Sequence, residues 1–303
     1  MSIVITGANG FIGRKLVQAL SNSARDLLLV DLSLPKDFSN GLWYSPESFL
    51  EFLEDSVENN GVTLILHFGA ISDAQSSNHE LLNKYNTEFT NSLAKNSSRL
   101  NIPFVFASSM SVYGQDGNSL DTSTLLPYAK SKRESENFIQ GLRLIYPEWP
   151  WLTLRLSNVF GYDEFSKRHM ASIPFRFTLD AVNTGSIRVW NVKDASGKLR
   201  IASRDFLFVD DLIVQIRKLI EHFPNKGILD LGSGKSTSLQ DLARVVAKGT
   251  KANILTVDIP QTIRQDTYQL FTCADIAWMK EPFNPSISFE QYVHSLIGKI
   301  EKT

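Results

Sequence analysis

Short apolar runs alternate with amphipathic stretches along the first half of the chain. The runs "IVITG" (3–7), "LLLVD" (27–31), "VTLILHFGA" (62–70), "PFVFASS" (103–109) and "WLTLRLSNVFG" (151–161) predict buried strands. Between them, apolar positions at helical spacing predict helices over 11–22, 46–58, about 77–101 and 128–146. Strands that alternate with helices form parallel βαβ units with right-handed crossovers. The pattern therefore predicts an α/β fold built on a doubly wound parallel sheet.

The pattern becomes irregular after residue 161. A helix is expected over about 170–183 and a short strand near 187–190, and the segments 204–212 and 227–232 are expected to return to the sheet. The rest of the C-terminal region alternates helices with short strands. Two domains are therefore predicted, a larger one formed by residues 1–165 and about 204–232, and a smaller C-terminal α/β lobe formed by 166–203 and 233–303.

Composition narrows the range of functions. The 303 residues are 43% hydrophobic and carry a formal net charge of −1, which describes a globular protein and does not favour electrostatic capture of nucleic acid or of an anionic membrane. Cys273 is the single cysteine, so an intrachain disulfide and a cysteine-based zinc site are excluded. No apolar run has the length or flanks of a membrane span or signal peptide, and a cytoplasmic location is expected.

The first glycine run, "TGANGFIG", follows a strand and begins a helix. Gly7, Gly10 and Gly13 permit a tight turn, a close approach of the backbone to a pyrophosphate, and close packing of helix on strand. Phe11 and Ile12 begin that helix, whose N-terminus attracts phosphate. Asp31 ends the next strand, where a carboxylate accepts the hydroxyls of an adenosine ribose. These features predict a Rossmann-like domain that binds NAD or NADP.

The second glycine run, "ILDLGSGKSTSLQDLARVV" (228–246), resembles a nucleotide site only superficially. A phosphate-binding P-loop requires glycine at position 229, which is Leu229. A methyl-donor domain needs more chain than the roughly 70 residues after Gly232 supply for a full parallel sheet. The run is therefore interpreted as a strand, a turn and a helix over about 237–248, with Ser236 or Ser238 near its N-cap.

The segment "YAKSK" places Tyr128 and Lys132 four residues apart, on one face of a helix. A lysine ammonium beside a phenol lowers the pKa of the phenol, and an oxidised nicotinamide adds positive charge, so the tyrosine becomes a base near neutral pH. Taken alone, this spacing also occurs in ordinary surface pairs. Its position shortly after "FASSMSVYG" favours a catalytic role.

The chain resembles the extended short-chain dehydrogenase/reductases, and among them the nucleotide-sugar epimerases. The matching segments are "TGANGFIG", "ASSMSVYG", "PYAKSK", "RLSNVFG" and "RDFLFVDDL". The resemblance implies a triad in which Ser109 hydrogen-bonds the substrate oxygen, Tyr128 takes its proton, and Lys132 holds the nicotinamide ribose. It also implies that "HFGA" forms the loop beneath the cofactor. The remaining cofactor-binding residues expected on this basis are His67, Gly69, Ala70 and Asn86.

One subgroup, the ADP-glycero-manno-heptose 6-epimerases, resembles the chain further. The segment "NVFGYDEFSKRHMASIPF" (158–175) matches it and implies that Lys167 is a second acid/base opposite the tyrosine. On residues alone, Lys167 would be a solvated loop lysine. The implied reaction oxidises a sugar carbinol to a ketone and returns the hydride to the opposite face, so the cofactor is recycled. The substrate-binding residues expected are Ser109, Asn158, Lys167, His169, Arg204 and Tyr268.

Several alternatives remain open at this point. Arg204 either clamps a phosphate or pairs with Asp205 or another neighbour. Asp31 favours NAD, whereas Lys36 is a candidate contact for the 2′-phosphate of NADP. Asp210 and Asp211 are interpreted as helix caps.

The reaction class also has alternatives. The related dehydratases carry an Asp-Glu pair after the triad serine, where this chain has Met110 and Ser111, so dehydration is not expected. A 4-epimerase or reductase of another nucleotide sugar, or a non-catalytic dinucleotide-binding regulator, would share the remaining features. By the same resemblance, the helices over 77–101 and 128–146 would pack across a twofold axis in a homo-oligomer.

Overall fold

The structure is a computed structural model that describes residues 1–21, 26–34, 42–73, 78–117, 125–224 and 226–301. The chain divides into two compact units, each made of three separate stretches. The first unit consists of Met1–Ser109, Leu126–Arg155 and Ile213–Leu229, and the second of Met110–Leu125, Leu156–Leu212 and Asp230–Thr303. Both the units and the predicted domains interleave along the chain. The predicted domain boundaries themselves stay a prediction.

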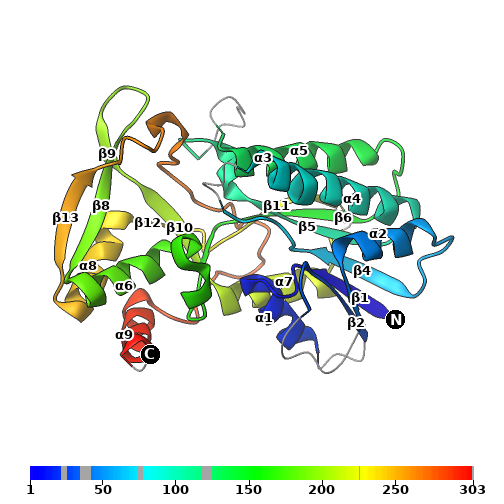
Figure 1. Ribbon diagram of the computed structural model, residues 1–303, viewed down its shortest axis with the longest axis horizontal. Coiled ribbons are helices and arrows are strands. Elements are labelled where there is room, and N and C mark those ends of the chain that lie inside the picture. The colour runs from blue at the N-terminus through cyan, green and yellow to red at the C-terminus, as the bar shows by residue number, and fades with distance from the viewer. Residues whose placement is uncertain (22–25, 35–41, 74–77, 118–124, 225, 302–303) are drawn as a thin grey trace. The chain divides into compact units, whose positions relative to one another are not determined.

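A seven-stranded sheet forms the centre of the first unit, in the order β11-β6-β5-β4-β1-β2-β3 (Figure 1). Pairing is parallel from β3 through β2, β1 and β4 to β5. The chain builds outward from β1 in one direction and then restarts at β4 in the other, so the order reverses between β1 and β4. Ligands of doubly wound sheets bind at the carboxyl ends of strands at such a reversal. The strands are β1 (Ser2–Thr6), β2 (Asp26–Val30), β3 (Leu42–Tyr44), β4 (Val62–His67), β5 (Phe104–Ser109), β6 (Trp151–Leu156) and β11 (Lys226–Leu231).

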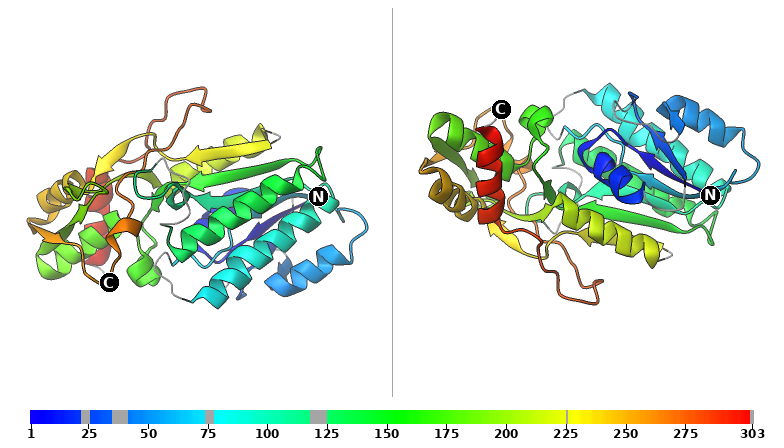
Figure 2. Two further views of the ribbon diagram at one scale, coloured as in Figure 1. Left: turned by 90° about the horizontal axis from the view of Figure 1, so that it is seen from above. Right: turned by 90° about the horizontal axis from the view of Figure 1, so that it is seen from below.

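Helices cover both faces of this sheet, which confirms the predicted doubly wound fold. Figure 1 shows α4 and α5 on one face and α1 and α7 on the other. The contacting helices α4 and α5 also lie side by side in the views of Figure 2. The helical elements are α1 (Phe11–Leu20), α2 (Pro46–Glu54), α3 (His79–Leu81), the π-helical turn η1 (Leu82–Glu88), α4 (Phe89–Arg99), the 3₁₀ turn η2 (Met110–Tyr113, in the second unit), α5 (Pro127–Leu142) and α7 (Val209–Glu221).

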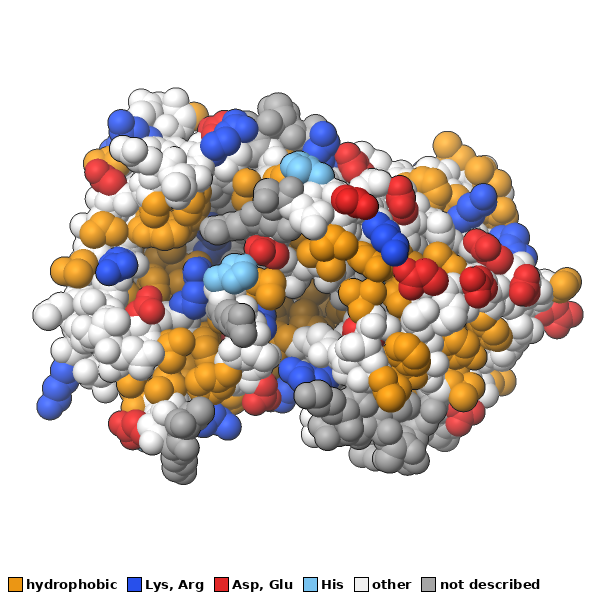
Figure 3. All heavy atoms as spheres, in the orientation of Figure 1, with side chains coloured by type: hydrophobic (Ala, Val, Ile, Leu, Met, Phe, Trp, Pro, Cys, Tyr) orange, Lys and Arg blue, Asp and Glu red, His pale blue; other side chains and the backbone are white. Residues whose placement is uncertain are grey.

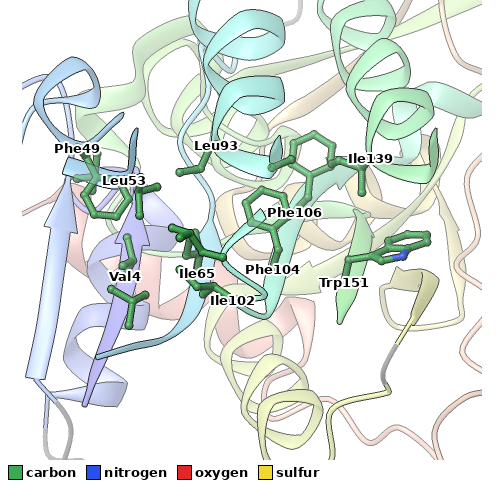
Figure 4. Packing of buried hydrophobic residues seen from close by; sticks show 14 of the residues in the cluster. Val4, Phe49, Leu53, Ile65, Leu93, Ile102, Phe104, Phe106, Ile139 and Trp151 are labelled. Carbon is green, nitrogen blue, oxygen red and sulfur yellow. The ribbon is translucent and has the colours of Figure 1, made fainter. Parts of the chain in front are cut away.

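The core of the first unit lies between the sheet and these helices. Figure 4 shows Leu93 of α4 and Ile139 of α5 beside the aromatic side chains of β5, Phe104 and Phe106. All four side chains are 0% exposed. Burial of side chains of this size stabilises the fold by about 1.5–3 kcal/mol each, so the face that carries α5 is firmly fixed.

The second unit contains two small sheets and a three-helix layer. One sheet has the order β12-β10-β7 and the other β13-β8-β9. The helices α6, α8 and α9 contact one another around a core that includes Phe175, Leu242 and Tyr292. The elements are β7 (Asn158–Phe160), η3 (Phe165–Met170), α6 (Ile173–Thr184), β8 (Ser186–Lys193), β9 (Leu199–Ile201), β10 (Ser203–Phe208), β12 (Ser236–Ser238), α8 (Leu239–Thr250), β13 (Asn253–Asp258), η4 (Gln265–Thr267) and α9 (Phe289–Ile300).

Two of the predicted strands are corrected by the structure. The run 151–161 is not one strand, because it divides at Ser157 into β6 of the large sheet and β7 of a small one. The segment 204–212 does not return to the large sheet. Its first half is β10, which pairs with β7 and β12, and its second half begins α7. Apolar runs reveal buried strands but not which sheet they join, because pairing is set by non-local contacts.

The described part of the chain adds two findings about surfaces and metals. None of its helices has both the length and the apolar character needed to cross a membrane. Nor does it bring together three or more His, Cys, Asp or Glu side chains in an arrangement suited to a metal ion. Figure 3 shows acidic and basic side chains interspersed over the displayed face, in agreement with the net charge of −1.

Candidate active site

The glycine turn between β1 and α1 lies at the reversal point of the sheet. Gly7 has φ of +68°, a left-handed conformation that favours glycine, and a Cβ placed there would lie 2.7 Å from the backbone of Gly69, which follows β4. A Cβ on Gly13 would lie 1.9 Å from the carbonyl oxygen of Gly7. The glycines are therefore required for the close approach of α1 and of the β4 loop to the turn.

The residues around this turn fit a dinucleotide. Gly10 is the N-cap of α1 and provides no side-chain cap, and the first turn contains no acidic residue. The first amides of a helix have no acceptor within the helix and, with the helix dipole, favour an anion. Asp31 follows β2, and its Oδ2 accepts a hydrogen bond of 2.8 Å from the backbone amide of Asn9. Lys36, the candidate contact for a 2′-phosphate, lies outside the described residues.

Beneath the turn, His67 at the end of β4 is fully buried. Its Nδ1 lies 2.6 Å from Thr6 Oγ1, and its Nε2 lies 2.8 Å from Thr90 Oγ1. Burial, and then the charge of Lys132, lower the pKa of His67 well below its usual range. Thr6 Oγ1 also accepts a hydrogen bond from the amide of Gly69. The neutral histidine thus supports the loop on which a cofactor would rest, and its contacts are to the protein.

The predicted cofactor residue Asn86 is likewise occupied by the protein. It lies in η1 and is 0% exposed. Its Oδ1 accepts from the amide of Ile71 at 2.7 Å, and its Nδ2 donates to the carbonyl oxygen of Ile71 and to Ser131 Oγ. These bonds fix the loop that follows β4 and contains the half-buried Ala70. A cofactor contact by the side chain of Asn86 stays a prediction.

The predicted triad residues come from β5 and α5 and lie within one unit. Ser109 ends β5, and its hydroxyl shares a hydrogen bond with the phenol of Tyr128 in the first turn of α5. Lys132 follows one turn later and is 2% exposed. Its Nζ donates to the carbonyl oxygen of Ala107 at 2.8 Å and lies 5.9 Å from the centroid of the Tyr128 ring.

Burial dominates the protonation of this pair. It raises the pKa of Tyr128 to about 12, against a smaller lowering by the hydrogen bond with Ser109. It also lowers the pKa of Lys132 to about 7, against an upward effect of Glu136. The expected lowering of the phenol pKa by Lys132 is therefore not found in the protein alone. The physical reason is that desolvation of the phenol outweighs the lysine, which is itself readily deprotonated at this site.

Sequence reasoning missed Glu136, which lies one turn beyond Lys132 on α5. Its carboxylate is 0% exposed and receives Arg155 Nε at 2.9 Å and Arg155 Nη2 at 2.6 Å. Ser108, the neighbour of Ser109, donates to Glu136 Oε1 at 2.6 Å. Glu136 therefore links α5, β5 and β6. Its spacing of four residues from Lys132 was the available sequence signal.

The remaining predicted residues belong to the second unit. Arg204 on β10 is 6% exposed, and its guanidinium donates to the carbonyl oxygens of Ser203 and Gln269. It lies 5.4 Å from the ring centroid of Tyr268. Burial lowers the pKa of Arg204 below its usual value. Asn158 on the adjoining strand β7 donates to the carbonyl oxygen of Asp205.

Arg204 does not pair with Asp205, which answers one open alternative. Within the described residues, the Asp205 carboxylate accepts from the amides of Ser233, Gly234 and Ala274 and from Ser233 Oγ, at 2.8–3.0 Å. A Cβ on Gly232 would lie 2.8 Å from Asp205 Oδ2. The second glycine run therefore encloses a carboxylate of its own chain. The predicted N-cap Ser238 is confirmed, since its side chain accepts from the amide of Gln240.

Lys167 and His169 both lie in the 3₁₀ segment η3. Lys167 Nζ donates to Glu164 Oε2 at 2.8 Å, and its side chain is 23% exposed, so it is not the solvated loop lysine expected from the residues alone. His169 is exposed. Glu164 was missed by sequence reasoning, although its spacing of three residues from Lys167 permits this pair.

Asp210 and Asp211 lie within the first turn of α7 rather than at its cap. Asp211 accepts from the amide of Ser286 at 3.1 Å through Oδ2. Its contact is thus with the C-terminal segment of the second unit. Neither carboxylate is part of the triad.

Comparison with known proteins follows from this geometry. The ADP-L-glycero-D-manno-heptose-6-epimerase of Brachyspira hyodysenteriae is 30% identical over 291 residues, which cover 90% of this chain and 89% of that protein. The enzyme of the same name from Pseudomonas paraeruginosa is 29% identical over 313 residues, covering 93% and 92%. The structure of Thermus thermophilus UDP-glucose 4-epimerase in complex with NAD superposes with a TM-score of 0.75 at 18% identity, over 99% of each chain.

The family comparison agrees with these similarities. The sequence profile described as the NAD dependent epimerase/dehydratase family matches residues 3–232, which include the glycine turn, the triad residues and Lys167. The match extends over more than half of the chain. The chain therefore belongs to the NAD dependent epimerase/dehydratase family.

Proposed function

We propose that the chain is an NAD-dependent epimerase that inverts C6 of an ADP-linked glycero-manno-heptose. The observation that carries the proposal is the arrangement of Ser109, Tyr128 and Lys132 in the same unit as the glycine turn at Gly7. The choice of sugar is supported by the names of the relatives that are 28–30% identical over at least 90% of the chain.

The proposed reaction uses the chain's own residues for binding and proton transfer. Ser109 hydrogen-bonds the oxygen of the reacting carbinol, and Tyr128 exchanges its proton. Lys132 holds the nicotinamide ribose. NAD, when bound, supplies a reversible acceptor for the hydride that leaves the same carbon. Because the hydride and the proton both return to the substrate, no external reductant is consumed.

Inversion requires the proton to be exchanged on both faces of the sugar carbon. We assign the second exchange to Lys167, on the strength of its match to the heptose epimerase segment and its partly buried ammonium. Arg204 is proposed to contact the diphosphate, because a buried guanidinium that has no carboxylate partner among the described residues is suited to an anion. Asn158, Tyr268 and His169 complete the proposed substrate contacts.

The test begins with mass spectrometry of the cofactor that co-purifies with the protein. Asp31 favours NAD, and recovery of NADP would correct that choice. The protein is then incubated with ADP-glycero-manno-heptose, and inversion at C6 is followed by proton NMR. Bound cofactor without turnover would direct the search to another nucleotide sugar. Absence of any dinucleotide binding would overturn the proposal.

Two substitutions separate the alternatives. Tyr128→Phe is expected to lower kcat by roughly 10²–10⁴-fold, whereas Tyr146→Phe, a matched change just beyond α5, should leave kcat unchanged. A regulator that only binds a dinucleotide would keep its function in Tyr128→Phe. Lys167→Ala is expected to abolish C6 inversion while retaining cofactor, and full activity in this variant would favour a 4-epimerase or reductase.

A further inference from the structure

The buried carboxylate of Glu164 is the least expected group in the segment between β7 and α6. It is 0% exposed and lies directly before η3. An ionised carboxylate is costly to remove from water unless charge and hydrogen bonds compensate it. The contacts of Glu164 therefore report what the segment is built to hold.

Three donors fix the position of this carboxylate. The amide of Gly161 donates to Oε1 at 2.9 Å, the amide of Ser172 donates to Oε2 at 2.7 Å, and Ser172 Oγ donates to Oε1 at 2.7 Å. Gly161 and Ser172 lie at opposite ends of the segment, and Ser172 is also the N-cap of α6. The carboxylate thus closes the segment and is itself held rigidly.

Lys167 provides the fourth contact. Its Nζ donates to Glu164 Oε2 at 2.8 Å, and 23% of its side chain is exposed while that of Glu164 is not. A lysine side chain has four flexible bonds and ordinarily samples many rotamers. Pairing with an immobile carboxylate restricts the ammonium to a small volume before any substrate arrives.

We propose that Glu164 is the positioning residue for Lys167, holding its ammonium in place for proton exchange on the second face of the sugar carbon. The inference rests on the proposed function, which assigns that exchange to Lys167. Glu164 does not touch substrate and acts through the lysine. Its relation to Lys167 is that of an anchored orienting carboxylate to an acid/base group.

A purely structural ion pair is the competing explanation. In that case Lys167 would be present only to compensate the buried charge of Glu164, and the segment would close without any effect on proton exchange. The two explanations differ in which variant loses kcat. They also differ in whether the effects of the two residues on kcat are independent.

The experiment uses the full chain with bound cofactor and compares Glu164→Gln, Lys167→Met and the double variant. Glu164→Gln keeps an oxygen for Gly161 and Ser172 but removes the charge that holds Lys167. Asp241→Asn is the matched control, because Asp241 also holds a cation three residues away, Arg244, but on the exposed surface of α8.

The first measurement needs no substrate. An amine-acylating reagent is applied, and modification of Lys167 is quantified by peptide mass spectrometry. Loss of the charge-assisted hydrogen bond should raise the acylation rate of Lys167 by about threefold or more in Glu164→Gln and leave it unchanged in Asp241→Asn. An unchanged rate in Glu164→Gln would overturn the proposal.

The second measurement is the kinetics of C6 inversion. Glu164→Gln should lower kcat by about 100-fold with KM within about twofold of the wild type. The double variant should be no slower than Lys167→Met alone, because the carboxylate acts only through the lysine. Unchanged kcat in Glu164→Gln together with a lower melting temperature would establish the structural ion pair and overturn the proposal.

Failure of the proposed function has a different signature. A wild-type protein that binds the dinucleotide but inverts no heptose would remove the reaction and with it the catalytic role of Lys167. The acylation rates would still report whether Glu164 holds the lysine. The two failures are therefore told apart within one set of variants.

Discussion

Two glycine turns in this protein follow a strand and precede a helix, yet they serve opposite purposes. At the Gly7 turn, α1 begins without a side-chain cap, at the reversal point of the large sheet. At the Gly232–Gly234 turn, the amides surround the carboxylate of Asp205 from the same chain. The first turn is available to an anionic ligand, whereas the second already holds an anion. Glycine spacing alone therefore does not identify a nucleotide site.

The largest predicted effect concerns the filled turn. Asp205→Ala would leave the donors of Ser233, Gly234 and Ala274 buried without an acceptor, so the free energy of unfolding should fall by about 4 kcal/mol. Chemical denaturation measures this loss. Cofactor affinity should stay within about threefold of the wild type, because the Gly7 turn is unaffected. A loss below about 1 kcal/mol would show that the carboxylate does not organise the turn.

The next effect concerns the open turn. Gly13→Ala would place a Cβ 1.9 Å from the Gly7 carbonyl oxygen and push α1 away from β1. We expect the free energy of unfolding to fall by about 2–3 kcal/mol and NAD affinity to fall by about 100-fold or more. Denaturation and calorimetric titration with NAD measure the two effects. Wild-type affinity in this variant would contradict the need for close packing at the turn.

A pH dependence should distinguish the open region from the filled one. Burial lowers the pKa of Lys132 from its ordinary value of 10.5 to about 7, so between these values the unfolded chain binds more protons than the folded protein. Stability of the cofactor-free protein should therefore rise with pH through this window, by at most about 1.4 kcal/mol per pH unit. Above pH 10 the raised pKa of Tyr128 opposes the trend.

Urea unfolding of the wild type and of Lys132→Met between pH 6.5 and 9.5 measures this contribution. The difference in stability between the two proteins should change with pH in the stated direction. Parallel pH profiles would mean that Lys132 is not desolvated in the folded protein.

The smallest effect calibrates the glycine substitutions. Gly298 lies inside α9, and a Cβ placed there would meet no atom within 4 Å. Gly298→Ala should raise the free energy of unfolding by about 0.5–1 kcal/mol, because alanine loses less conformational freedom in a helix. Thermal unfolding measures the gain. A loss instead would indicate that backbone changes in α9 disturb its packing, and the interpretation of Gly13→Ala would need the same correction.

Local patterns predicted the parts of the site whose residues are close in sequence. The turn at Gly7 depends on strand, turn and helix in immediate succession, and Tyr128 and Lys132 are one helical turn apart. Such relations follow from the geometry of single elements. The doubly wound sheet was predictable for a similar reason, because each βαβ unit is recorded in consecutive segments.

Relations between distant segments were not predictable in the same way. The break at Ser157 falls within a continuous apolar run, so composition carries no sign that β7 pairs with β10. Asp205 meets amides 28 to 69 residues away in sequence. The protonation of Tyr128 depends on how deeply its phenol is buried, and that depth is a property of tertiary packing.

The interleaving of the two units limits how such a chain diversifies. The chain passes between the units at residues 109/110, 125/126, 155/156, 212/213 and 229/230. Neither unit is encoded by one continuous stretch of the gene, so a single recombination event cannot transfer one unit intact to another protein. New substrate preferences in this architecture are therefore expected to accumulate by point substitutions and by changes in loop length, with the cofactor-side residues retained in place.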